Sequence, residues 1–196
     1  MTALGLDSSN NQTPVKNVVI AGGGTAGWMA ATALSRLLGK SVSVTLVESK
    51  DIGIVGVGEA TIPPIRTFHK LLGIDEKAFM RATQATFKLG IEFENWREVN
   101  HSYIHSFGIT GRECWAGEFH HFWLRAQDYG FGGDFGDYCP ELIAAKQNKF
   151  ATSDAMPLNF AYHFDAVAYG RFLKSLACDA GVTHREGDIE KVTVCP

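Results

Sequence analysis

Apolar positions at the start of the chain change spacing twice and predict a strand, a helix and a second strand. Residues 15–21 form a short apolar run that is typical of a buried strand. The spacing then becomes helical over residues 26–38, and residues 41–47 alternate apolar and polar side chains as a half-buried strand does. Parallel strands joined through a helix form a right-handed crossover, so we predict an α/β fold.

The remaining pattern predicts short helices and strands without an internal repeat. Helices are expected at residues 63–72, 76–83, 118–129, 141–149 and 166–180, and strands at 87–96, 102–107 and 189–194. Asp75 and Asp165 occupy the N-cap positions of two of these helices. Residues 52–60 are expected to form a glycine-rich loop. We therefore expect a polar tail over residues 1–14 and one domain over residues 15–196, with an inserted segment at about 85–160.

Composition narrows the classes of function. The 196 residues are 45% hydrophobic and carry a net charge of −3, without the clustered basic residues that a nucleic-acid partner requires. Neither a secretory signal nor a membrane-spanning apolar run is visible, so we expect a cytoplasmic protein without a membrane partner. Four scattered cysteines form no CxxC pair, and the adjacent His120 and His121 would point about 100° apart on a helix. No metal site is predicted.

A glycine motif lies between the first predicted strand and helix. Residues 22–27 have the spacing GxGxxG, which suits a tight turn, close approach of a pyrophosphate to the backbone, and close packing of helix on strand. Glu48, at the end of the second strand, is placed to accept hydrogen bonds from a ribose diol, which disfavours NADP but leaves FAD and NAD open. The predicted dinucleotide contacts are Gly22, Gly24, Thr25, Ala26, Gly27 and Glu48.

Four further segments carry a resemblance to a known family. Residues 55–63 read VGVGEATIP, residues 87–96 read FKLGIEFENW, residues 103–108 read YIHSFG, and residues 162–165 read YHFD. In this order they resemble the flavin-dependent halogenases of the tryptophan halogenase type, over residues 18–194. The resemblance implies a Rossmann-like FAD-binding domain of the flavin monooxygenase type.

The resemblance also implies an activity. In that family a separate flavin reductase supplies reduced FAD, and O2 and chloride or bromide yield a hypohalous acid through a flavin hydroperoxide. Lys88 is similar to the catalytic lysine that guides this oxidant to a small aromatic, indole-like substrate. By the same resemblance, Gly58, Glu59, Ala60 and Ile189 are expected to contact the cofactor, and His105 and Phe107 the substrate.

Several alternatives stay open at this point. Lys88 could act as a neutral amine that forms a haloamine, or as an ammonium that activates the hypohalous acid by hydrogen bonding. Strict alternation along residues 87–93 would instead place Lys88 on the solvent side of a strand. The WxWxIP signature of the family is absent, so we expect a truncated, N-terminal portion whose activity on its own is open. An aromatic hydroxylase, a non-catalytic flavin-binding fragment and a homodimer are also considered.

Overall fold

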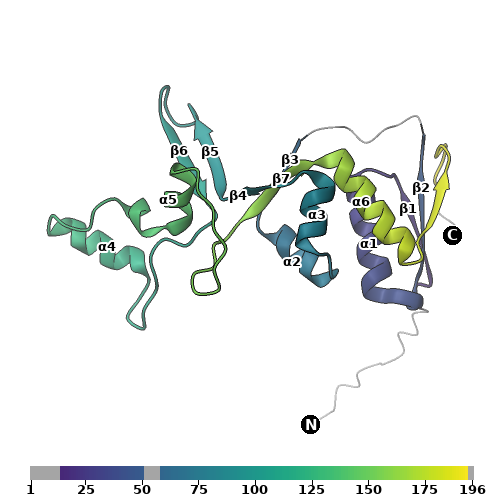
Figure 1. The fold of residues 1–196 in the computed structure, drawn as a ribbon, viewed down its shortest axis with the longest axis horizontal. Coiled ribbons are helices and arrows are strands. Elements are labelled where there is room, and N and C mark those ends of the chain that lie inside the picture. The colour runs from purple at the N-terminus through teal and green to yellow at the C-terminus, as the bar shows by residue number, and fades with distance from the viewer. Residues whose placement is uncertain (1–13, 51–57, 194–196) are drawn as a thin grey trace, which may run out of the picture. The chain divides into compact units, whose positions relative to one another are not determined.

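The protein divides into two compact units. The computed structural model describes residues 14–50 and 58–193 (Figure 1). Unit 1 comprises residues 1–55 and 170–196, and unit 2 comprises residues 56–169, so their boundary falls within helix α6 (Ala166–Asp179). The predicted inserted segment at about 85–160 lies wholly within unit 2. Most of the predicted tail, and residues 52–57 of the predicted glycine-rich loop, lie outside the described residues.

Unit 1 contains the predicted strand–helix–strand arrangement. Strand β1 (Asn17–Ala21), helix α1 (Thr25–Leu38), the short 3-10 helix η1 (Gly39–Ser41) and strand β2 (Ser43–Glu48) follow one another. The two strands are parallel, with Asn17 opposite Ser43 and Ala21 opposite Val47. The predicted α/β class is confirmed.

The third strand of unit 1 differs from the prediction. Strand β8 (Thr183–Glu186) pairs in parallel with β2 and completes the order β1-β2-β8. The strand predicted at residues 189–194 is wrong, because residues 187–193 belong to no strand and residue 194 lies outside the described range. The sequence of β8 is polar, and as an edge strand it leaves its side chains largely exposed, so its hydrophobic pattern is weak.

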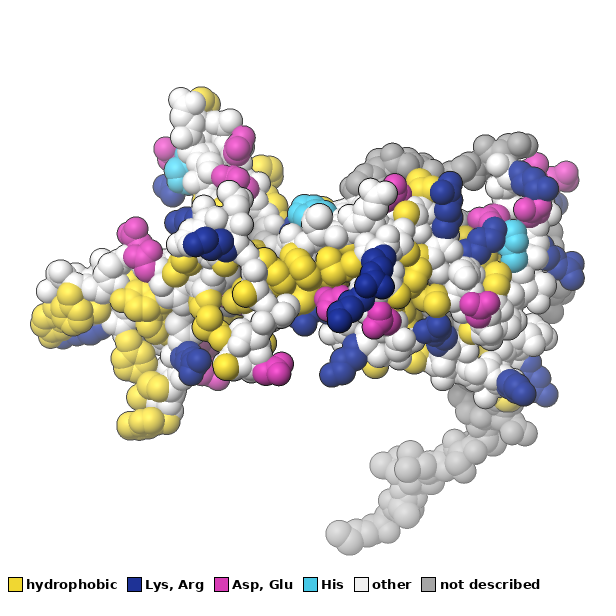
Figure 2. All heavy atoms as spheres, in the orientation of Figure 1, with side chains coloured by type: hydrophobic (Ala, Val, Ile, Leu, Met, Phe, Trp, Pro, Cys, Tyr) yellow, Lys and Arg dark blue, Asp and Glu magenta, His cyan; other side chains and the backbone are white. Residues whose placement is uncertain are grey.

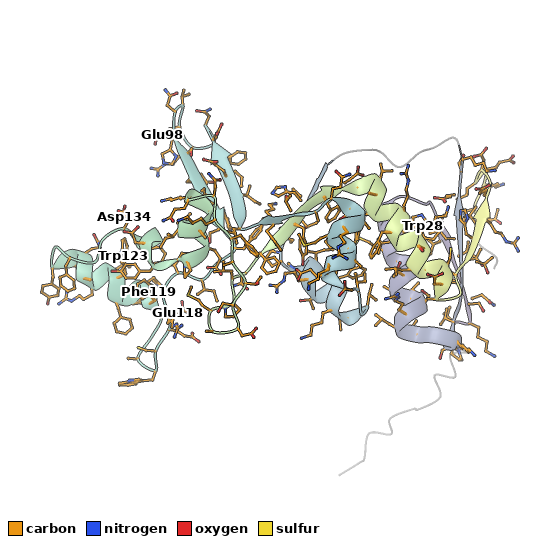
Figure 3. All side chains as sticks on the ribbon, viewed as in Figure 1. Trp28, Glu98, Glu118, Phe119, Trp123 and Asp134 are labelled. Atoms are coloured by element: carbon orange, nitrogen blue, oxygen red, sulfur yellow. The ribbon has the colours of Figure 1, made fainter. Side chains whose placement is uncertain are left out.

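Helices α1 and α6 lie side by side in unit 1 (Figure 1). Thr32 of α1 links the two helices. Its hydroxyl lies 2.7 Å from the carbonyl oxygen of Trp28 on α1 and 3.3 Å from that of Leu173 on α6. Trp28, labelled on α1 in Figure 3, and Leu173 are both buried. These residues fix the helices that surround the glycine motif.

Unit 2 is organised around an antiparallel sheet of order β3-β7-β4. Strand β7 (Ala161–Asp165) is central, between β3 (Gly58–Ala60) and β4 (Thr86–Lys88). The last residues of the predicted loop 52–60 therefore form a strand. The predicted strand 87–96 is also wrong as one element: it divides at Leu89 into β4 and β5 (Gly90–Glu94), and β5 pairs with β6 (Ser102–Ser106) in a separate sheet.

Helices α2 (Pro64–Leu71) and α3 (Glu76–Thr83) pack against strand β7 in unit 2. Asp75 caps α3 by accepting a hydrogen bond from the Ala78 N–H at 2.7 Å, and Asp165 accepts from the Ala168 N–H at 2.8 Å at the start of α6. Both predicted N-caps are confirmed. The core is aromatic and is formed by Phe79, Tyr162, Phe164 and Tyr169, all buried.

His69 is a buried polar member of this aromatic core. Its Nε2 lies 2.8 Å from the Tyr169 hydroxyl, and its ring meets Phe79 edge to face at 4.5 Å. Burial lowers the pKa of His69 to about 4, because the apolar surroundings penalise the charged imidazolium. The side chain is 5% exposed and is therefore neutral in the folded protein at pH 7.

We expect acidification to destabilise the protein through His69. An unfolded histidine takes up a proton near pH 6.5, whereas the folded residue does so only near pH 4, so stability falls as the pH drops between these values and this contribution is constant above and below them. The loss amounts to about 3 kcal/mol. Urea unfolding of the wild type and of His69→Gln at pH 7.5 and pH 4.5 measures it. Equal pH dependence in the two proteins would contradict the assignment.

Residues between β6 and β7 form the least buried part of unit 2. They contain helix α4 (Phe119–Asp128), a short 3-10 helix (Phe135–Tyr138) and helix α5 (Pro140–Lys146). No residue of α4 is buried, and hydrophobic side chains gather on the visible surface over this helix (Figure 2). Ring contacts such as Trp123 with Phe135, at 5.0 Å, hold the segment together. No helix in the described part of the chain is long and apolar enough to cross a membrane.

Candidate active site

The turn between β1 and α1 has the backbone geometry that a bound phosphate requires. Gly22 has φ +116°, a conformation that favours glycine, and its N–H donates to the Val47 carbonyl at 2.9 Å. Gly24 caps α1 and is open: a Cβ added there would meet nothing within 4 Å. The first turn of α1, which includes Thr25 and Ala26, has no acidic residue and no side-chain cap. Its N–H groups are therefore available to an anion.

Gly27 brings helix and strand into close contact. A Cβ added at Gly27 would lie 2.0 Å from the Gly22 carbonyl oxygen, which is backbone and cannot move aside as a flexible side chain can. Any larger residue must push α1 away from the turn. The third glycine of the motif thus sets the separation between the start of α1 and the end of β1.

Glu48 ends β2 beside this turn, and its two carboxylate oxygens differ in their surroundings. Lys174 Nζ donates to Oε1 at 2.8 Å, and His184 Nε2 lies 2.8 Å from the same oxygen. Trp28 Nε1 makes the longer contact, 3.4 Å, with Oε2. A Cβ added at Gly23 would lie 1.5 Å from Oε2, so this oxygen lies directly against the glycine turn.

In unit 2, the GEAT sequence is held against β7. Glu59 lies opposite Phe164, and Ala60 opposite His163, in the β3–β7 pair. The next residue, Thr61, continues the pairing through its hydroxyl, which donates to the Tyr162 carbonyl at 2.9 Å and accepts from the Tyr162 N–H at 3.0 Å. The Thr61 backbone N–H also donates to the Tyr162 carbonyl at 3.0 Å, so three hydrogen bonds fix Thr61 to the central strand.

Lys88 lies at the end of β4 and is buried, with an exposed fraction of 7%. Its Nζ donates to the Thr61 carbonyl oxygen at 3.0 Å, which joins the lysine to the GEAT segment. The solvent-side position that strict alternation would give Lys88 is wrong, because β4 ends here and both Lys88 and Leu89 are buried. Alternation holds only in β5, where Glu92 and Glu94 are exposed.

The surroundings of Lys88 favour an uncharged amine. Burial lowers its pKa from the ordinary 10.5, because an ammonium loses solvation that the apolar neighbours do not replace. Its Nζ also lies 5.5 Å from the centre of the Phe107 ring. Lys88 lines a cavity of about 460 Å³ together with Phe87, Glu92, Lys149, Phe150 and His163. The pKa of His163 is lowered chiefly by burial.

Phe107 and His105, the two residues expected to contact the substrate, differ in burial. Phe107 is partly buried, and its N–H donates to the Leu89 carbonyl at 2.8 Å, which keeps the ring beside Lys88. His105 is exposed on β6, opposite Ile91. Phe107 therefore lies beside Lys88, whereas His105 lies on β6 opposite Ile91.

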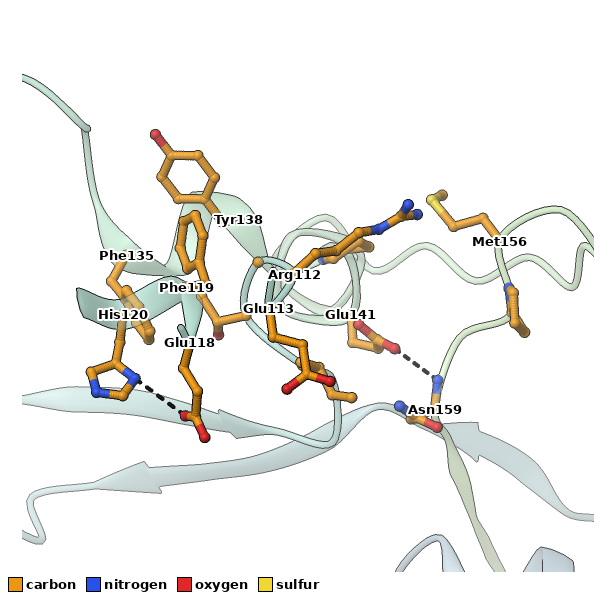
Figure 4. A pocket seen from close by; sticks show the side chains of 15 residues that line it. Arg112, Glu113, Glu118, Phe119, His120, Phe135, Tyr138, Glu141, Met156 and Asn159 are labelled. Atoms are coloured by element: carbon orange, nitrogen blue, oxygen red, sulfur yellow. Dashed lines mark hydrogen bonds and ion pairs between the residues drawn. The ribbon is translucent and has the colours of Figure 1, made fainter. Parts of the chain in front are cut away.

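A larger cavity of about 1110 Å³ lies among residues 109–159 of unit 2. In Figure 4 the rings of Phe119, Phe135 and Tyr138 lie on one side of it, with Phe119 and Tyr138 centroids 4.8 Å apart. Arg112 and the buried Glu141 belong to the other side, where Glu141 accepts a hydrogen bond from the Asn159 N–H at 2.8 Å. The cavity thus combines an aromatic wall with charged groups.

Two predicted cofactor contacts receive little structural definition. Ile189 follows β8 and is 47% exposed, outside any strand. Gly58 begins β3 opposite Asp165, but residues 51–57, which precede it, lie outside the described range.

The sequence did not predict the contacts of Lys174, His184 and the Thr61 carbonyl, because none of these residues belongs to a glycine motif or to an alternating pattern. Among the described residues, no group of three or more His, Cys, Asp or Glu side chains is placed to hold a metal ion.

The chain matches the tryptophan halogenase family model over residues 17–196. It is 35% identical to a 7-chloro-L-tryptophan 6-halogenase of Kutzneria sp. (strain 744), with 88% of this chain and 38% of that protein covered. It is 33% identical to a tryptophan 7-halogenase of Lentzea aerocolonigenes, with 91% and 37% covered. The chain therefore spans little more than a third of the length of these relatives.

Solved structures give the same result. A flavin-dependent halogenase from Xanthomonas campestris superposes with a TM-score of 0.87 at 58% sequence identity, covering 92% of this chain and 37% of that one. A flavin-dependent halogenase from Brevundimonas sp. BAL3 gives a TM-score of 0.82 at 36% identity, covering 93% and 37%. At these identities the likeness extends beyond the fold to the family.

Proposed function

Because the chain belongs to the tryptophan halogenase family, we propose that the protein halogenates a small aromatic, indole-like substrate with reduced FAD, O2 and chloride or bromide. The observation that carries the proposal is the burial of Lys88, whose Nζ donates to the carbonyl of Thr61 in the GEATIP motif. Buried lysines are rare, and a lysine whose pKa is lowered by burial beside a cavity is a candidate for a functional amine. We also infer a cytoplasmic location and a separate flavin reductase as partner.

The residues of unit 1 fit the adenosine and pyrophosphate end of FAD. The open Gly24 and the uncapped start of α1 suit the pyrophosphate, and Glu48 Oε2 suits a ribose diol. In unit 2, Gly58, Glu59 and Ala60 are proposed to contact the flavin, and Ile189 of unit 1 the adenine. When bound, reduced FAD supplies the activation of O2 that converts halide into hypohalous acid.

Lys88 is proposed to hold the hypohalous acid next to the substrate. The Thr61 carbonyl accepts an N–H from either protonation state of the amine, so it fixes the position of Nζ without requiring a charge. A neutral Nζ, which burial favours, has a lone pair that can take the halogen from oxygen; an ammonium would instead polarise the oxidant by hydrogen bonding. In the first route the N–X bond replaces the O–X bond and the displaced hydroxide leaves as water with an amine proton, whereas in the second the halogen stays on the oxygen of the hydrogen-bonded acid. Both routes would keep the oxidant beside Nζ.

Phe107 is proposed to support the aromatic ring of the substrate. Its ring lies beside Lys88, and a planar substrate stacked on it would present one edge to Nζ. His105 is proposed as a second substrate contact, reached from the exposed face of β6. The aromatic wall of Phe119, Phe135 and Tyr138 offers a further surface for planar molecules.

The test is mass spectrometry of indole and phenol substrates incubated with the whole protein, FAD, a flavin reductase, NADH and either bromide or chloride. We expect a product in which one hydrogen is replaced by halogen. A product that gains one oxygen instead would identify an FAD-dependent aromatic hydroxylase. Bound FAD without any product would reduce the assignment to a flavin-binding protein.

A further inference from the structure

Glu48 is held by two residues that come from distant parts of the chain. Lys174 lies on α6 and His184 on β8, and each makes a 2.8 Å contact with the same carboxylate oxygen, Oε1. Lys174 Nζ also lies 3.4 Å from His184 Nε2, so the three side chains form one cluster. Oε1 therefore accepts a hydrogen bond from Lys174 and lies within ion-pair distance of His184, so both residues hold this oxygen in place.

The second oxygen of Glu48 remains available. Among the residues that the structure describes, Oε2 has only the long 3.4 Å contact with Trp28 Nε1, and it lies against the backbone of Gly23. The Glu48 side chain is 19% exposed, so solvent still reaches part of it. Anchoring Oε1 leaves Oε2 as the oxygen that can accept from a hydroxyl.

Trp28 packs against both residues that hold Glu48. It is buried in α1, one residue after the last glycine of the motif, and Lys174 Nζ lies 5.3 Å above its ring. The His184 ring packs against the same indole, with centroids 5.6 Å apart. Both groups that hold Oε1 are thus kept in place by one buried aromatic side chain, which restricts the rotamers that they can adopt.

We propose that Lys174 and His184 are positioning residues for the adenosine ribose of FAD, acting through Glu48. They turn the carboxylate so that Oε2 meets the 2′-hydroxyl, and the charge of Lys174 offsets the repulsion between Glu48 and the nearby pyrophosphate. The inference rests on the proposed use of FAD, and it adds a determinant of cofactor recognition that lies outside the glycine motif.

The experiment compares dissociation constants of FAD and of FAD that lacks the adenosine 2′-hydroxyl, measured by flavin fluorescence with the whole protein. We expect the wild type to prefer FAD by about tenfold, the effect of one hydrogen bond to a charged group. Lys174→Met should reduce this preference to about twofold, and Lys174→Arg, which can still donate, should restore most of it. Lys50→Met is the matched control, because Lys50 forms its 2.6 Å ion pair with Glu186.

Glu48→Gln separates the possible outcomes. If Glu48→Gln abolishes the preference and Lys174→Met has no further effect in that background, Lys174 acts through Glu48 as proposed. If Glu48→Gln abolishes the preference but Lys174→Met alone retains it, the inference is overturned while the role of Glu48 remains. A wild type that binds both ligands equally also overturns the inference, whereas a wild type that binds neither would overturn the proposed use of FAD itself.

Discussion

Replacing Lys88 with methionine is expected to lower the rate of halogenation by about a thousandfold or more, the scale of a lost catalytic group. Methionine keeps most of the buried volume but has no N–H for the Thr61 carbonyl and no nitrogen to receive the halogen. FAD binding should stay within about twofold of the wild type, because the predicted phosphate and ribose contacts belong to other residues. Liquid chromatography with mass detection measures the product, and flavin fluorescence measures binding.

Lys149→Met is the control for the Lys88 experiment. Lys149 lines the same 460 Å³ cavity but is exposed, so the same substitution there removes a lysine from the cavity wall without touching the buried amine. We expect this variant to keep most of the activity. Halogenated product at near wild-type rates from Lys88→Met would show that the oxidant reaches the substrate without this lysine, and the proposed role would be wrong.

Alanine substitutions at two positions of the glycine motif should have different effects: one should lower stability, and the other should weaken FAD binding. Gly27→Ala is expected to destabilise the protein by about 3 kcal/mol, because its Cβ would lie 2.0 Å from the Gly22 carbonyl and the start of α1 must shift. Gly24→Ala meets no atom within 4 Å and has φ −68°, so the melting temperature should stay within about 2 °C of the wild type.

The Gly24 variant should nevertheless bind FAD at least about tenfold more weakly, because its methyl group would project into the space where we propose that the pyrophosphate approaches the backbone. Calorimetry for stability and fluorescence titration for FAD separate the two effects. Unchanged FAD affinity in Gly24→Ala would argue against phosphate binding at this turn. Unchanged stability in Gly27→Ala would argue against the close helix–strand contact.

The sequence predicts the local features of this fold better than its long-range ones. The first strand, helix and second strand, and the caps at Asp75 and Asp165, depend on neighbouring residues and were predicted correctly. The last strand was misplaced because β8 reads THRE, a polar edge sequence, while residues 189–194 alternate more convincingly. Hydrophobic pattern fails where a strand buries little of its surface.

Site residues show the same division. The glycine motif and Glu48 could be predicted from the sequence, because their spacing along one short segment is typical of dinucleotide-binding proteins. Lys174 and His184 lie more than a hundred residues after Glu48 in the sequence and contact it only through the packing of α6 and β8. Local periodicity cannot predict such a long-range contact. The burial of Lys88 likewise depends on pairing with β7, since a three-residue strand has too few positions to show which of its faces is covered.

The order of strands in unit 2 has a consequence for how such enzymes diversify. The β3-β7-β4 sheet that carries Lys88 takes its strands from either side of residues 89–160, and those intervening residues add no strand to it. Lengthening a closed loop costs little, about 0.6 kcal/mol for each doubling. Insertion and deletion can therefore rebuild the walls of the larger cavity while Lys88 keeps its place in the sheet.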